Sequence, residues 1–135
     1  MVFAVRFRWE EAGEVVLSVD RQLRFPELPR EPGVYRLVFQ GPPPQHVYVG
    51  EAADLRRRMG NYRNPGPTQQ TSLRVNGLLI DHLAGGGTGR LSVAFSVEIS
   101  QGRGRAPADL SNSNLRRLAE HAAIACENAG ELHNR

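Results

Sequence analysis

Two short tyrosine-containing segments carry residue types that could do chemistry. Gly33-Val34-Tyr35 is followed, after eleven residues, by Val47-Tyr48-Val49-Gly50, and Arg58 lies ten residues beyond the second tyrosine. A phenol can accept or relay a proton, but with a pKa of about 10 it is a poor base at neutral pH unless a nearby cation lowers that value. A guanidinium binds phosphate through paired hydrogen bonds. Together these residue types suit chemistry on a phosphate ester.

These segments resemble the two tripeptide motifs of the GIY-YIG nuclease family. Gly33-Val34-Tyr35 matches the first tripeptide and Tyr48-Val49-Gly50 matches the second. Arg58 falls where the family has the arginine of its first helix. The resemblance implies a metal-dependent endonuclease that hydrolyses phosphodiester bonds of DNA.

The resemblance resumes near the end of the chain. Residues 118–124 are similar to the glutamate helix of the family, with the glutamate at Glu120. Residues 132–135 are similar to its terminal asparagine segment, with Asn134 as the asparagine. The match covers about residues 33–135, so the first thirty residues lie outside it.

The resemblance implies a role for each matched residue. Tyr35 is expected to act as the general base or to orient the attacking water, with Tyr48 as its partner near the scissile phosphate. Arg58 is expected to bind that phosphate, and Asn134 to support Glu120. Glu120 is expected to hold Mg²⁺ or Mn²⁺, because magnesium commonly takes one or two carboxylates and keeps most of its water.

Helical periodicity places Glu120 beside the apolar stripe of the last helix. At about 100° per residue Glu120 lies one step beyond Ala119, outside the stripe, so we expect it on a flank that faces a site. Cys126 is expected to be buried within the stripe, whereas His121 and Glu127 are expected at the surface. The stripe itself comprises Leu115, Leu118, Ala119, Ala122 and Cys126.

Several other residues are candidates for auxiliary roles. Tyr62 lies one turn beyond Arg58, where some members of the family carry histidine, so its phenol either carries a proton or packs. His46 precedes Tyr48 by two residues and shares its strand face, from which it could polarise the site. The basic side chains expected to contact nucleic acid are Arg56, Arg57, Arg63, Arg74, Arg103 and Arg105.

Alternation of polar and apolar residues predicts strands, and longer periods predict helices. Strands are expected over 34–39, 46–49 and 91–99. Helices are expected over 55–62, 72–83 and from 111–113 to about 128, with Asp54 capping the first and Gly130 ending the last. A flexible basic loop is expected over 101–107.

The order of these elements predicts an α+β fold. We expect a small mixed or antiparallel sheet flanked by helices, GIY-YIG-like, with an N-terminal β-hairpin extension whose turn lies at 10–14. The expected organisation is an extension over residues 1–30 and one compact nuclease-like unit over residues 31–135.

Composition limits the class of protein. All 17 basic residues are arginine, 14 residues are acidic, and the formal net charge is +3, which is compatible with a nucleic-acid partner. The single cysteine excludes an internal disulfide, and no apolar run is long enough to cross a membrane. The N-terminus does not have the pattern of a secretory signal, so we expect a cytoplasmic location.

A second function class stays open. A non-catalytic nucleic-acid-binding module, or a subunit of a DNA repair or restriction complex, would use the arginines equally well. The joint presence of both tyrosines, Arg58 and Glu120 favours an enzyme. DNA is the expected partner, with RNA left open, no membrane association is expected, and a dimer is one option for the oligomeric state.

Overall fold

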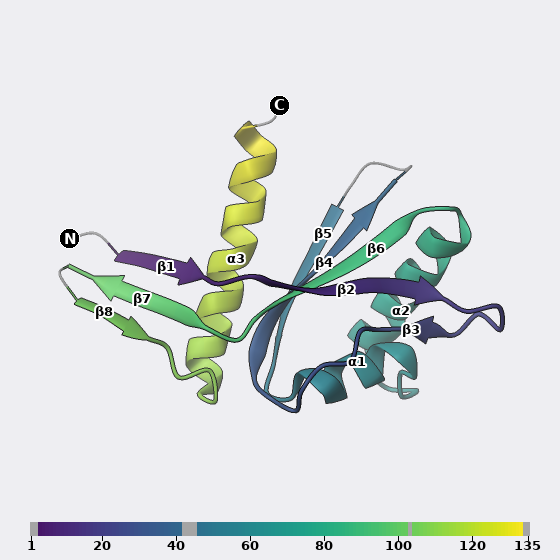
Figure 1. Ribbon diagram of the computed structural model, residues 1–135, viewed down its shortest axis with the longest axis horizontal. Helices are drawn as coiled ribbons and strands as arrows, with labels where there is room; N and C mark the ends of the chain where they lie inside the picture. The colour runs from purple at the N-terminus through teal and green to yellow at the C-terminus, as the bar shows by residue number, and fades with distance from the viewer. Residues whose placement is uncertain (1–2, 42–45, 103, 134–135) are drawn as a thin grey trace.

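The computed structural model describes residues 3–41, 46–102 and 104–133 of the 135-residue chain. It contains a five-stranded sheet, a three-stranded sheet and three helices (Figure 1). The elements are β1 (Phe3–Phe7), β2 (Glu10–Leu17), β3 (Leu23–Arg24), β4 (Gly33–Gln40), β5 (His46–Ala52), α1 (Leu55–Arg63), α2 (Gln70–Ala84), β6 (Thr88–Ala94), β7 (Val97–Gln101), β8 (Gly104–Pro107) and α3 (Ser113–His133).

Both sheets are antiparallel, and the predicted α+β class is confirmed. The larger sheet has the order β3-β2-β6-β4-β5, and the smaller has the order β1-β7-β8. The single strand predicted over 91–99 is wrong, because the chain leaves the larger sheet after Ala94 and enters the smaller one at Val97. Leu91 and Val97 are both buried, but in different cores, so alternation alone does not reveal the break.

The N-terminal strands do not form the predicted hairpin. β1 pairs with β7, whereas β2 pairs with β6 and β3. Residues 10–14, expected to be a turn, belong to β2 and contain a register shift between Glu11 and Gly13, where Gly13 has a φ of 137°. β6 lies between β2 and β4 and pairs with both, so β2 joins the larger sheet whereas β1 joins the smaller one. The division into residues 1–30 and 31–135 stays a prediction.

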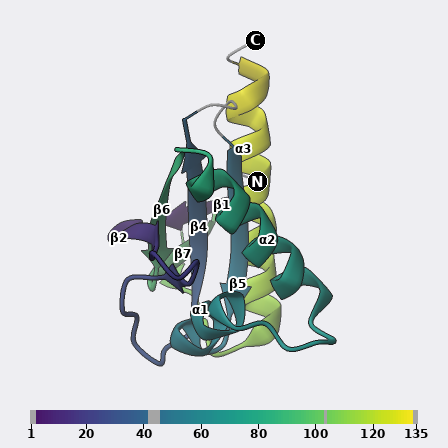
Figure 2. The same cartoon turned by 90° about the vertical axis from the view of Figure 1, so that its right-hand side faces the viewer.

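The larger sheet is covered on both faces. One face packs against α1 and α2 and buries Leu37, Leu55 and Leu79. The other face packs against α3 and the smaller sheet and buries Val49 and Ala119. Figure 2 shows α3 running beside β5, which is the edge strand of the larger sheet.

The helices differ from expectation mainly at α3. Asp54 caps α1 as predicted, its carboxylate accepting a hydrogen bond of 3.0 Å from the backbone N–H of Arg57. α3 continues past Gly130 to His133, so the predicted stop is wrong. Gln101 ends β7 and Gly104–Pro107 form β8, which pairs with β7, so the flexible loop predicted over 101–107 is wrong for these described residues.

The buried face of α3 is rotated from the predicted stripe. Cys126 is exposed and Leu118 is 40% exposed, whereas Arg116, Ala119 and Ala123 are buried. The rotation is possible because Arg116 finds acceptors in the interior, described below. Within the part of the chain that the structure describes, no helix combines the length and apolar character needed to cross a membrane.

Candidate active site

The tyrosines of the two tripeptides lie on one face of the β4–β5 ladder. Tyr35 is in register with Gly50, and Tyr48 is two residues from Gly50 on the same strand, so the two tyrosines are diagonal neighbours. A side chain at position 50 would overlap the Tyr35 hydroxyl, which explains why the tripeptide ends in glycine. The two phenols therefore lie on the same face of the ladder.

Tyr62 of α1 joins both tyrosines. Its hydroxyl hydrogen-bonds that of Tyr35, and both side chains are 0% exposed. The Tyr62 ring meets the rings of Tyr35 and Tyr48 edge to face, with centroid separations of 6.0 Å and 6.5 Å. Tyr62 thus packs in the core and also holds a hydrogen bond, because α1 buries its Leu55, Met59 and Tyr62 positions together.

The surroundings of the phenols disfavour their ionised forms. Burial, with Tyr62 adding to it, raises the pKa of Tyr35 well above its ordinary value. Burial likewise raises the pKa of Tyr48 to about 12, again with a contribution from Tyr62. Arg58 acts against the first shift and Arg74 against the second, but neither outweighs burial. Among the described protein groups, Arg58 does not bring either phenol pKa below its ordinary value.

Arg58 projects from α1 into the same cluster. Its side chain is half-buried, and burial acts to lower its pKa, but the neighbouring Tyr35 and Tyr62 oxygens raise it overall. The guanidinium therefore stays charged beside the phenols. It is placed to meet an anion that approaches the edge of β5.

Glu120 reaches the cluster from the opposite layer. α3 covers the other face of the sheet, yet it runs beside the edge strand β5, and the Glu120 carboxylate lies close enough to Tyr48 to raise that phenol's pKa. The Glu120 side chain is 24% exposed. Burial and the nearby Glu51 raise its pKa, while His121 and Arg58 act in the opposite direction.

Glu51 and Arg116 are site residues that the sequence analysis did not single out. Glu51 follows Gly50 directly, and one of its oxygens lies 2.6 Å from Arg116 Nε. Arg116 also donates to the carbonyl oxygens of Leu110 (3.0 Å) and Ser111 (3.1 Å). Their positions in the sequence could have indicated them, because Glu51 adjoins the second tripeptide and Arg116 lies one helical turn before Glu120.

Glu120 could supply a carboxylate oxygen to a divalent cation, whereas the neighbouring Glu51 is already paired with Arg116 at 2.6 Å. No group of three or more His, Cys, Asp or Glu residues is arranged for a metal ion among the described residues. This donor set suits Mg²⁺, which binds through one or two carboxylates, waters and substrate phosphate rather than an all-protein cage.

The remaining predicted residues divide between the site and other places. Arg74 of α2 lies near Tyr48 and so belongs to the site. The His46 ring instead stacks on the Phe39 ring, with a centroid separation of 4.3 Å. Arg105 pairs with Glu98 at 3.6 Å on the smaller sheet. Three further arginines of the prediction are exposed on α1: Arg56, Arg57 and Arg63. Two predicted residues, Arg103 and Asn134, lie outside the described residues.

Comparisons with known proteins find nuclease relatives. The chain is 31% identical over 102 residues to UvrABC system protein C of Legionella pneumophila, in the strains Lens and Paris, covering 76% of this chain and 14% of each relative. It is 57% identical over 37 residues to a Mycobacterium tuberculosis (strain CDC 1551 / Oshkosh) protein named as a putative bifunctional exonuclease/endonuclease, covering 27% of this chain and 5% of that protein. The chain therefore spans only a small part of the length of these relatives. No family model matches the chain.

A solved structure shares the fold. A mutant of bacteriophage T4 EndoII superposes with a TM-score of 0.56 at 16% identity, covering 82% of this chain and 84% of the other. The fold and these relatives confirm the resemblance to the GIY-YIG nucleases that the tripeptides predict: the chain has the architecture of a GIY-YIG endonuclease domain.

Proposed function

We propose that this chain is a metal-dependent DNA endonuclease that hydrolyses phosphodiester bonds at the edge of β5. The observation that carries the proposal is the convergence of two phenols, a guanidinium and a carboxylate at one partly open place. These groups come from β4, β5, α1 and α3, which are separate elements of the sequence that the fold brings together. The nuclease names of the relatives support the same interpretation.

The proposed roles follow from exposure and charge. Tyr48, which is half-buried, orients or deprotonates the attacking water, whereas the enclosed Tyr35 holds Tyr62 and Arg58 in position. Arg58 binds the scissile phosphate and stabilises the charge that develops on it. Glu120, with Glu51 beside it, holds Mg²⁺ or Mn²⁺. Asn134 retains its expected supporting role from the resemblance.

Bound Mg²⁺ or Mn²⁺ supplies Lewis-acid stabilisation of the phosphate oxygens. The surroundings of Glu120 raise its pKa, through burial first and Glu51 second, and so disfavour its ionised form. Arg58 acts in the opposite direction by its positive charge. Neutral pH is well above the ordinary carboxyl range, so the ionised form can still predominate.

Nicking of supercoiled plasmid tests the proposal. The wild type is expected to nick with Mg²⁺ or Mn²⁺ and not with EDTA, and Glu120→Gln is expected to bind duplex DNA but not to nick it. Glu127→Gln is the matched control on the same helix, because Glu127 pairs with Arg36 at 2.5 Å instead of facing Tyr48. Nicking by Glu120→Gln at the wild-type rate would refute the metal-holding role.

A nucleic-acid-binding module without turnover is the second candidate. The raised pKa of both tyrosines favours it, since neither phenol is primed to act as a base by the described protein groups. The same assay separates the two functions. Tight binding of plasmid with no metal-dependent nicking by the wild type would select the binding module.

A further inference from the structure

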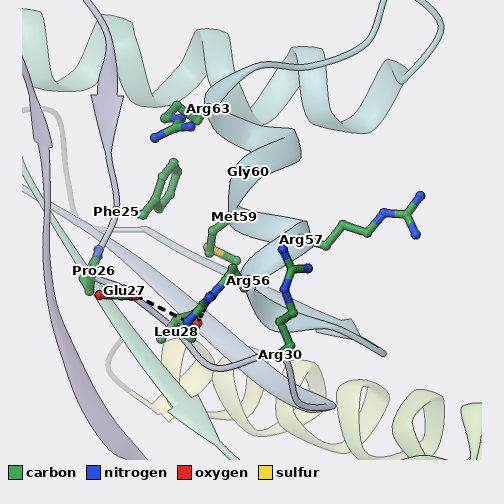
Figure 3. A pocket seen from close by; sticks show the side chains of 10 residues that line it. All are labelled: Phe25, Pro26, Glu27, Leu28, Arg30, Arg56, Arg57, Met59, Gly60 and Arg63. Atoms are coloured by element: carbon green, nitrogen blue, oxygen red, sulfur yellow. Dashed lines mark hydrogen bonds and ion pairs between the residues drawn. The ribbon is translucent and has the colours of Figure 1, made fainter.

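A basic groove lies between α1 and residues 25–30. Its volume is about 460 Å³. Figure 3 shows Arg63 at one end and Arg30 and Arg56 at the other, with Phe25 and Met59 between them. We call it the arginine groove; its lining is Phe25, Pro26, Glu27, Leu28, Arg30, Arg56, Arg57, Met59, Gly60 and Arg63.

The guanidinium groups of the arginine groove are open to an external anion. Arg30 lies 3.1 Å from Asp54 but is 65% exposed. Arg56 is 46% exposed: its Nε donates to the Leu28 carbonyl oxygen at 2.7 Å, and its ion pair with Glu27 at 3.4 Å is open to solvent. Such exposed pairs contribute little and are readily exchanged for another anion. Arg57 and Arg63 are exposed, and neither forms an ion pair within the described residues. Four arginines line the groove and, in the described part of the chain, only two carboxylates, Glu27 and Asp54, pair with them, so the groove is complementary to a polyanion.

The spacing of these cations suits a nucleic-acid backbone. Arg56 and Arg63 are seven residues apart on α1, which corresponds to a rise of about 10 Å. One strand of duplex DNA carries a phosphate for about every 3.4 Å of axis, so this rise matches about three nucleotides.

α1 carries cations on two opposite flanks. At about 100° per residue, Arg58 lies about 150° around the helix from Arg56 and Arg63. Arg58 faces the phenols, whereas Arg56 and Arg63 line the groove. Between the flanks, the outer surface carries the exposed Arg57, about 100° around the helix from Arg56, with Gly60 on the groove side of it. A helix with its side chains is about 10–12 Å across, and the major groove of B-DNA is about 12 Å wide.

We propose that the arginine groove binds the backbone of the DNA strand that is not cut. α1 then lies in the major groove of a duplex, with the scissile strand at Arg58. The opposite strand lies along Arg30, Arg56 and Arg63 of the arginine groove. The assignment of the scissile strand rests on the proposed function. The partly exposed ring of Phe25 meets the sugars between the phosphates, above the buried Met59.

Binding measurements in EDTA test this inference. Fluorescence anisotropy compares the wild type with Arg30→Gln/Arg63→Gln on a short labelled duplex and on one of its single strands, over a series of salt concentrations. Loss of two phosphate contacts should reduce the slope of log K against log salt by about two for the duplex. The single strand lacks the uncut partner, so its slope should change by less than half as much.

The matched control removes the same charge elsewhere. Arg6→Gln/Arg8→Gln alters two exposed arginines at β1 and should leave the slope for the duplex unchanged. Arg63→Gln alone, which breaks no described ion pair, should reduce the slope by about one and guards against an effect of altered folding. Three outcomes would each overturn the inference. The slope could fall equally for duplex and single strand, it could fall equally in the Arg6→Gln/Arg8→Gln control, or the wild type could fail to bind duplex.

Cleavage separates this inference from the proposed function. If the wild type never nicks DNA but the groove variants lose duplex affinity as expected, the proposed function fails and the groove assignment stands. If the wild type nicks DNA but the groove variants bind duplex normally, the groove assignment fails alone.

Discussion

Tyr35 and Tyr48 share their chemistry but differ in their surroundings. Tyr35 is 0% exposed with its hydroxyl bonded to that of Tyr62, so solvent water does not reach it in this structure. Tyr48 is half-buried at the edge strand and lies near Arg74 and Glu120. The tripeptides therefore hold one tyrosine suited to positioning and one suited to contact with substrate.

The raised pKa of Tyr48 predicts an alkaline pH dependence of cleavage. A phenol with a pKa of about 12 is almost wholly protonated at neutral pH. If Tyr48 is the base, the single-turnover rate should increase about tenfold for each pH unit between about pH 7 and 9. Tyr48→Phe should be slow throughout this range. A wild-type rate that is flat with pH would rule out phenolate as the reacting base.

Arg58 is expected to act on turnover more than on folding. Arg58→Ala removes one donor from the proposed transition state, which should slow single-turnover cleavage by about a hundredfold to a thousandfold. Arg117→Ala, an exposed arginine on α3, is the control and should cleave normally. An unchanged rate for Arg58→Ala would dismiss the phosphate-binding role.

At the scale of elements, α1 depends on a capping residue adjacent to the site. The Asp54 side chain accepts from the backbone N–H of Arg57 and also meets Arg30, and these contacts, the backbone one first, lower its pKa. The start of α1, and with it Arg58, is held by this cap. Asp54 therefore both caps α1 and links its start to Arg30 of the preceding segment.

Asp54→Ala should lower the melting temperature by a few degrees at neutral pH, because an N-cap side chain satisfies an otherwise free backbone donor. Since folding lowers the pKa of Asp54, this contribution is present above its ordinary value of 3.8 and is lost as the pH falls through the lowered value. The melting difference from wild type should therefore narrow in acid. Glu27→Ala, at a highly exposed ion pair, should melt as wild type does; an equal loss there would contradict a capping role.

For the whole molecule, the tie between α3 and β5 decides where Glu120 lies. Arg116 and Glu51 are only 10% and 18% exposed, and they join the helix of one layer to the edge strand of the sheet. The second tie, Arg36 to Glu127, is more open, at 29% and 32%. Glu120 lies between these two ties along α3.

Arg116→Met is expected to reduce the free energy of unfolding by about 3 kcal/mol, because it leaves Glu51 and two carbonyl oxygens without their partner. Arg36→Met should cost about 1 kcal/mol or less, since its pair is partly solvated. Urea unfolding followed by circular dichroism measures both. Similar reductions in the free energy of unfolding for the two variants would show that the Arg116–Glu51 pair stabilises the fold no more than the partly solvated Arg36–Glu127 pair does.

Much of the local structure could be predicted from the residues. The alternation over 34–39 and 46–49, and the Asp54 cap, correctly locate β4, β5 and the start of α1. Cys126 shows the limit, because an apolar residue at helical spacing was expected inside and is exposed. Glu51 and Arg116 show the same limit. Charged residues are usually exposed, and only the tertiary structure brings these two together as a largely buried pair.

The sequence by itself determined the strands of the two tripeptides, the beginning of α1 and the residue types of the candidate site. Periodicity and capping are local, so they act within a few residues and can be read along the chain. Only the tertiary structure decided that β1 pairs with β7, that Tyr35 is enclosed by Tyr62, and that Glu120 approaches Tyr48 around the edge of β5. These outcomes depend on which distant surfaces meet, and burial and pairing energies settle that choice only when the whole chain has packed.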